Sequence, residues 1–453
     1  MLFNLTNPEV AIFMMAIFLF AVLLGFPIAF TLMAMGVGFG YYAYYDPTRM
    51  EHLLDNRIFQ LFVQNTYTVM DNTVLTAVPL FLFMGYLVER AGIVSRLFFA
   101  IRLASHRLPA SMAVAALITC ALFSTATGII GAVVTLMGLL AWPAMIRAGY
   151  DKKFASGVIC SGGCLGILIP PSIMLIVYSV IAQLSPLRLF AAAIFPGLLL
   201  AGLYIAYAII RAYINPSIAP KPQEGEIPPR SKILKEVLVS FLPLFSLIIL
   251  VLGTILGGLA TPAEAAGVGA FGAIVLSYFY KTLKWKNFKE SVFLTAKTTA
   301  MIMWLFIGSW TFASVFSYLG GHEVFEHFFK SMNIAPWQFL VITQIIIFLL
   351  GWPLEWTEIL IIFVPIFLPL VEFFGVNPYF FAMLIALNLQ TSFLTPPMAM
   401  SAYYLKGVQT KNVELLDIFR GIMPFLAIVI FAMVLMYMFP GIALWLPDAL
   451  FAN

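Results

Sequence analysis

The chain has 453 residues, of which 62% are apolar and only 10% are charged, with 24 lysines and arginines against 20 acidic residues. A soluble globular protein carries about 25% charged residues, so this composition excludes that class and predicts an all-α polytopic membrane protein. The formal net charge of +4 is ordinary for a membrane protein with basic cytoplasmic loops and does not indicate nucleic-acid binding. Three cysteines in apolar sequence predict neither a disulfide framework nor a metal site: Cys120, Cys160 and Cys164.

The first apolar run covers residues 11–42 and is interrupted by Gly25 and Pro27. Because proline lacks an amide hydrogen and glycine is flexible, we expect one membrane span that is kinked or unwound at this point. Similar uncharged runs recur along the whole chain. At about 20 residues per span they predict ten to twelve crossings of the lipid bilayer.

Two later stretches look like copies of each other. The first reads CSGGCLGILIPPSIMLIVY from Cys160, and the second reads ALNLQTSFLTPPMAMSAYY from Ala386. Each carries a Pro-Pro pair in an uncharged segment of more than 30 residues, which is too long for one crossing and too short for two. We therefore predict two re-entrant hairpins, over about 154–187 and 376–405, whose tips are buried in protein or line a wet cavity.

An internal repeat is indicated by a constant offset of 226 residues. This offset pairs Pro170 with Pro396, and it also pairs Pro143 with Pro369, Phe154 with Phe380 and Tyr178 with Tyr404. The matches fall at structurally demanding positions, so we interpret them as a repeat of two membrane halves. The halves are predicted as 1–213 and 237–453, joined by a polar, proline-rich linker at 214–236.

Hydroxyl and glycine residues gather around the predicted hairpin tips and at a second break near residue 128. Unwound backbone carbonyls and neutral hydroxyls suit a sodium ion, and helix N-termini at the same tips would attract an anionic substrate. For any single residue, close helix packing or a local backbone hydrogen bond is an alternative explanation. The sodium candidates are Ser124, Thr125, Thr127, Gly128, Ser161, Gly162, Gly163, Gly351, Thr391 and Thr395, and the substrate candidates are Pro170, Pro171, Ser172, Gln390, Ser392, Pro396 and Pro397.

Acidic residues inside apolar sequence are few. Glu355 and Glu358 are spaced to share a helix face and follow a proline break, so they are candidates to carry protons or ions. Two neighbouring tryptophans favour the alternative that this segment lies at the membrane interface.

Several motifs together resemble the large membrane subunit of tripartite ATP-independent periplasmic (TRAP) transporters. They are LLGFPIAF, VPLFLFMGYLVERAGI, GILIPPSIMLIVY, ATPAEAAGVGAFGA and FLTPPMAMSAYYLKGV, and they cover nearly the whole chain. The resemblance implies an elevator transporter with inverted repeats in the bacterial inner membrane, driven by sodium ions bound beside both hairpins, without an organic cofactor. It also implies two partners: a small four-helix membrane subunit, expected here as a separate chain, and a periplasmic binding protein that delivers a small organic acid, a carboxylate or a sulfonate.

Two other classes of protein are alternatives. Glu264-Ala265-Ala266 superficially resembles the ATPase-docking loop of an ATP-driven importer, but it lies in an apolar run, and the chain has no GxxxxGK[ST] motif for nucleotide. A membrane enzyme is disfavoured because the histidines form no convincing acid-base or metal set: His52, His106, His322 and His327.

Overall fold

The computed structural model describes residues 6–48, 50–220, 230–409 and 413–451. Helices dominate these residues, and none of them lies in a β-strand, which confirms the predicted all-α class. Seven of the described helices are long and apolar enough to cross a membrane, or up to eight if a bent pair counts as one span. Several shorter apolar helices accompany them, so the ten to twelve crossings stay a prediction.

The first half of the chain forms ten α-helices and two short 3-10 turns. Two breaks between these helices lie beside candidate residues: one separates α6 from α7, and the other separates α8 from α9. The elements are α1 (Asn7–Leu23), α2 (Ile28–Ala43), η1 (Leu53–Asp55), α3 (Arg57–Met70), α4 (Ala77–Arg90), α5 (Ile93–Ala104), α6 (Ser111–Thr127), α7 (Ile130–Arg147), α8 (Lys152–Cys164), η2 (Leu165–Ile167), α9 (Ile173–Ala182) and α10 (Pro186–Ile214).

The second half begins with a long helix at Arg230. Residues 230–236 of the predicted linker therefore belong to this helix, while residues 221–229 of that linker lie outside the described residues. The elements are α11 (Arg230–Leu256), α12 (Pro262–Phe279), α13 (Trp285–Tyr318), α14 (Gly321–Ser331), α15 (Pro336–Leu350), α16 (Trp356–Glu358), the π-helical turn η3 (Ile359–Phe363), α17 (Val364–Phe373), α18 (Pro378–Ser392), α19 (Met400–Val408), α20 (Leu415–Met438) and α21 (Gly441–Phe451).

The two halves repeat each other helix by helix. Moved on by 226 residues, α7 covers 356–373, which is the stretch filled by α16, η3 and α17. The same shift brings α8 onto α18, α9 onto α19, and α3 and α4 together onto the long α13. The predicted repeat is therefore present over most of the chain.

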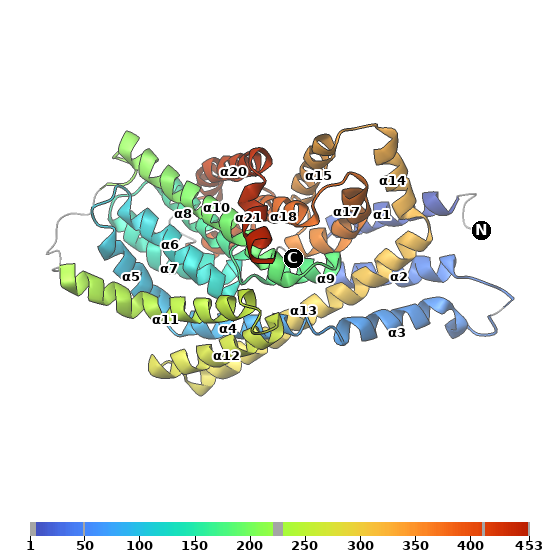
Figure 1. Cartoon of the computed structure of the whole chain (residues 1–453), viewed down its shortest axis with the longest axis horizontal. Helices are drawn as coiled ribbons and strands as arrows, with labels where there is room; N and C mark the ends of the chain where they lie inside the picture. Colours follow the sequence, from blue (N-terminus) through green and yellow to red (C-terminus); the bar gives the residue numbers. More distant parts are fainter. Residues whose placement is uncertain (1–5, 49, 221–229, 410–412, 452–453) are drawn as a thin grey trace.

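Contacts between the halves are reciprocal, as expected of two copies related by a pseudo-two-fold axis. Helix α2 packs against α13 while α12 packs against α4, and α8 packs against α20 while α18 packs against α10. In Figure 1, α3, α4, α12 and α13 lie along one side of the molecule and α8, α18 and α20 lie toward the other. Two of the hairpin helices, α8 and α18, therefore lie away from the first group, while the hairpin helix α9 contacts α4.

The N-terminal segment differs from the predicted single span. The break at Gly25 and Pro27 is where the sequence indicated, but the chain reverses there: the rings of Phe13 on α1 and Phe39 on α2 lie 6.2 Å apart, so the two helices run antiparallel. Gly25 has a φ of +86°, a conformation that glycine adopts readily. Together with Pro27, which caps α2, it makes a tight turn instead of a kink.

Candidate functional site

The first predicted hairpin consists of two short helical arms, α8 and α9, joined by η2 and a cis Pro170–Pro171 bond. At about 1.5 Å per residue, α8 and α9 are roughly 20 and 15 Å long, so neither crosses a hydrocarbon core of about 30 Å. Both prolines are buried, and so is Ser172, whose hydroxyl donates to the Ile167 carbonyl at 2.6 Å. The substrate candidates of this half thus lie inside the protein.

The second hairpin has the same plan, with arms α18 and α19 joined by a cis Pro396–Pro397 bond. The Asn377 side chain caps α18 by accepting from the Tyr379 amide at 2.9 Å. Unlike the first pair, Pro396 and Pro397 are exposed. The two double-proline tips therefore sit in different surroundings although their sequences match.

The hairpins contact each other in the folded chain. The Cys160 thiol of α8 donates to the Ser401 carbonyl of α19 at 3.5 Å, and the Ser401 hydroxyl donates to the Phe393 carbonyl at 2.6 Å. Helix α18 in turn packs against α9 and η2. Candidate residues that are more than 200 positions apart in the sequence are thereby brought into one region.

The hydroxyl cluster of the first half lies at the end of α6. Thr127 ends this helix and Gly128 follows with a φ of +63°, so the chain breaks at the predicted place. The Ser124 hydroxyl donates to the Gly163 carbonyl of the hairpin at 3.4 Å. The remaining two hydroxyls bond carbonyls of their own helix, as the alternative explanation predicts: Thr125 donates to Ala121 and Thr127 to Phe123.

The glycine candidates of α8 have a clear packing role. A Cβ on Gly162 would lie 3.1 Å from Cys120, and one on Gly163 would lie 2.3 Å from Val134. Gly166, which is not among the residues predicted from the sequence, also packs closely: its Cβ would lie 2.8 Å from the Ser124 carbonyl oxygen. These residues let the hairpin pack directly on the break between α6 and α7.

The second half repeats this contact with the residue types exchanged. A Cβ on Gly351, which follows α15, would lie 2.5 Å from the Ser392 hydroxyl of α18. Moved by 226 residues, Gly166 falls on Ser392, and Ser124 falls next to Gly351. In each half a glycine therefore meets a serine where a broken helix touches a hairpin. The offset alone would have identified Gly166.

Several candidate side chains are buried without a partner. The hydroxyls of Ser161 and Ser392 and both amide atoms of Gln390 make no hydrogen bond to any described residue. Leaving such groups unpaired costs about 1–3 kcal/mol each, so a bound ion or ligand that satisfied them would recover this energy. By contrast, Thr391 donates to the Asn388 carbonyl at 2.7 Å and Thr395 to the Thr391 carbonyl at 2.8 Å.

Glu358 is a further polar group near this region. It lies just before the π-helical turn η3, is only 5% exposed, and has one carboxylate oxygen without a partner among the described residues. The part of the chain that the structure describes contains no group of three histidine, cysteine or acidic residues able to hold a metal ion. The oxygens gathered at the hairpins are mostly neutral, which suits a monovalent hard cation.

The sequence of the chain matches one known protein family and several of its members. Residues 14–442 match the family model described as tripartite ATP-independent periplasmic transporter, DctM component. The chain is 29% identical over 382 residues to the C4-dicarboxylate TRAP transporter large permease protein DctM of Pseudomonas aeruginosa, with 83% of this chain and 87% of that protein covered. It is 31% identical over 384 residues to the sialic acid TRAP transporter large permease protein SiaM of Vibrio cholerae, with 83% and 87% covered.

Two further proteins extend these matches. The isethionate TRAP transporter permease protein DctMQ of Oleidesulfovibrio alaskensis is 28% identical over 384 residues, which cover 84% of this chain and 59% of that protein. Among solved structures, the Alcanivorax borkumensis YdaH transporter superposes with a TM-score of 0.60 at 16% identity, and the match covers 96% of this chain and 99% of that one. At this identity the structural likeness concerns the fold.

Proposed function

The chain belongs to the family of TRAP transporter large membrane subunits, and from this premise we propose that it imports a small organic acid together with sodium ions by an elevator movement. As a large permease subunit it is a multi-pass membrane transporter and not an enzyme. The family also disfavours the alternative of an ATP-driven importer.

The observation that carries the sodium proposal is the set of unpaired oxygens in the first arms of the hairpins. Ser161 lies on α8 and Ser392 on α18, both are buried, and neither hydroxyl has a described partner. A hydroxyl that already donates to a carbonyl still has lone pairs for a cation. The sodium ligands would therefore be drawn from Ser161, Ser392 and the neighbouring hydroxyls and carbonyls of the two helix breaks.

The substrate is proposed to bear a negative charge. The relatives are named for C4-dicarboxylates, sialic acid and isethionate, which share an acidic group. In this chain, α9 and α19 begin just after the two hairpin breaks, so the positive ends of their helix dipoles favour an anion there. The buried Gln390 amide, which has no described partner, could donate to the same group.

The partners and the movement are proposed on the same premise. A TRAP transporter is a tripartite system, and we infer a small four-helix membrane subunit and a periplasmic binding protein that delivers the acid. The moving part would be the hairpin helices α8, α9, α18 and α19 with α20, and the static part would be α2, α4, α12 and α13. Helix α8 packs extensively on α20, and so do α2 on α13 and α4 on α12. We propose that the complete system lies in a bacterial inner membrane.

Reconstitution into liposomes tests the proposal. The chain is purified with its small subunit, and uptake of a labelled acid is measured with the loaded binding protein outside. Uptake should follow an inward sodium gradient and should stop when potassium replaces sodium on both sides. Uptake that needs ATP and ignores sodium would reject the proposal.

A further inference from the structure

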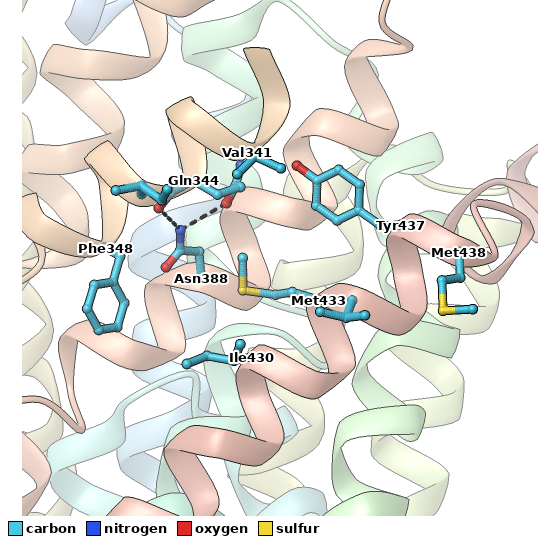
Figure 2. Close-up of a pocket in the computed structure, with 10 residues that line it drawn as sticks. Val341, Gln344, Phe348, Asn388, Ile430, Met433, Tyr437 and Met438 are labelled. Carbon is cyan, nitrogen blue, oxygen red and sulfur yellow. Dashed lines mark hydrogen bonds between the residues drawn. The ribbon is translucent and has the colours of Figure 1, made fainter. Parts of the chain in front are cut away.

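A hollow of about 570 Å³ lies between α15, α18 and α20, and its lining residue Phe348 adjoins the contact between Gly351 and Ser392. Figure 2 shows Gln344 and Phe348 on one wall and Met433 and Tyr437 on another, with Asn388 beside Gln344. Aliphatic and methionine side chains make up most of the lining. Methionine adapts its shape to irregular apolar partners.

The packing around the hollow differs from that of the corresponding helices in the first half. In the first half, α6 packs directly against α10, whereas their counterparts α15 and α20 are separated by this space. Ile345 and Val434, on the two sides of the opening, are 54% and 47% exposed. The space therefore opens on the lipid-facing surface and is a departure from the repeat.

Two polar groups in the hollow lack a hydrogen-bond acceptor. The Asn388 amide donates to the Gln344 side-chain oxygen at 2.9 Å. The Gln344 side chain is only 5% exposed, and its amide nitrogen has no partner among the described residues. The Tyr437 hydroxyl is likewise unpaired among these residues. A ligand that fits here is mainly apolar and carries acceptor oxygens.

The Tyr437 hydroxyl lies toward one end of the hollow, while Gln344 lies midway along the α15 wall. The Tyr437 ring is 6.2 Å from that of Phe380, near the start of α18, and Phe339, near the start of α15, stacks on Phe374 at 4.6 Å. Phe348 is nine residues further along α15, which is about 13 Å deeper at 1.5 Å per residue. The hollow thus runs from the helix ends, where Tyr437 lies, into the apolar layer.

We propose that this hollow is a binding site for a membrane phospholipid, with an acyl chain between α15 and α20 and its ester oxygens accepting from Tyr437 and Gln344. A transmembrane helix of a partner fits less well, because helix contacts within membranes are enriched in small residues, and the described residues of the lining include no glycine, alanine, serine or threonine. The hollow has about 570 Å³ along the two turns from Val341 to Phe348. An acyl chain is narrower and needs no backbone partner.

The test uses the complex of the chain with its small subunit in nanodiscs that contain a phosphatidylglycerol with a photoactivatable acyl chain. Crosslinked peptides should concentrate on Gln344–Phe348 and Ile430–Met438. Val434→Trp fills the opening from an exposed position and should reduce this labelling severalfold. Phe431→Trp, on the same helix, 51% exposed and outside the lining, should leave it unchanged.

A second measurement tests the role of the polar groups. Unlabelled ester phospholipid should compete with the probe better than its ether analogue, by about two- to tenfold, which corresponds to one hydrogen bond. Tyr437→Phe should reduce this difference without loss of the complex, because Gln344 still donates. Labelling spread evenly over the lipid-facing helices, or disulfide crosslinks that place a helix of the small subunit at Val434, would overturn the proposal. Neither outcome depends on sodium-coupled transport.

Discussion

Gly351 and Ser392 touch where the broken end of α15 meets the first arm of the second hairpin, so closely that a Cβ on Gly351 would lie 2.5 Å from the serine hydroxyl. Gly351→Ala should turn this hydroxyl away without unfolding the hairpin, since only the end of a small side chain has to move. We expect a higher sodium concentration for half-maximal uptake. Gly407→Ala, a site with no atom within 4 Å, is the control and should behave as wild type; equal behaviour of both variants would contradict a ligand role for Ser392.

Ser172→Ala and Thr395→Ala each remove a hydroxyl beside a double-proline tip. The lost hydrogen bonds run to Ile167 and Thr391, and each is worth about 0.5–1.5 kcal/mol. We expect both variants to fold and to need roughly two- to tenfold more sodium for uptake. Sodium titrations that match the wild type in both variants would remove these residues from the set of ligands.

Gln390→Leu separates function from stability. Both amide atoms of Gln390 are buried without a described partner, so replacement by a similarly sized apolar side chain should keep or raise the melting temperature of the substrate-free complex. Substrate uptake should nevertheless fall, and the Michaelis constant should rise. A variant that loses stability and activity together would show that Gln390 is a structural residue.

Gly421→Ala tests the packing between the hairpin and α20. Its Cβ would lie 1.9 Å from the backbone carbonyl of Lys153, which cannot move without shifting α8. Overpacking of this kind costs about 1–3 kcal/mol, and a lower melting temperature of the purified complex should report it. Gly202→Ala in α10 has open space around its Cβ and should not lower that temperature.

The breaks in the helices could be predicted from the sequence because they depend on local chemistry. Prolines 170, 171, 396 and 397 remove amides, and Gly128 adopts a positive φ, so the hairpins and the offset of 226 were visible in the residues alone. The number of membrane crossings could not be read from the sequence in this way, because a short apolar helix and a full span have the same composition. The reversal at Gly25 was missed for the same reason: a kink and a turn use the same two residue types.

The details of the site depend on contacts between distant segments. Periodicity and composition do not reveal that the Ser124 hydroxyl donates a hydrogen bond to the Gly163 carbonyl. Nor do they reveal that the Ser401 carbonyl accepts one from the Cys160 thiol, 241 positions away in the sequence. They also cannot separate Ser161 and Ser392, whose hydroxyls have no described partner, from Thr125, whose hydroxyl bonds its own helix. The candidate residue types were predictable, but their hydrogen-bond partners required the fold.

The central claim is that unpaired hydroxyls in the two hairpins hold sodium, and the most direct test is the melting temperature of the purified complex as sodium replaces potassium at constant ionic strength. A ligand that binds only the folded state raises the free energy of unfolding. The increase grows with the logarithm of the ratio of ligand concentration to dissociation constant. We predict a rise with sodium that is reduced in Ser161→Ala and in Ser392→Ala and nearly absent in the double variant. Melting temperatures that are equal in sodium and potassium, or a sodium response unchanged in the double variant, would contradict the claim.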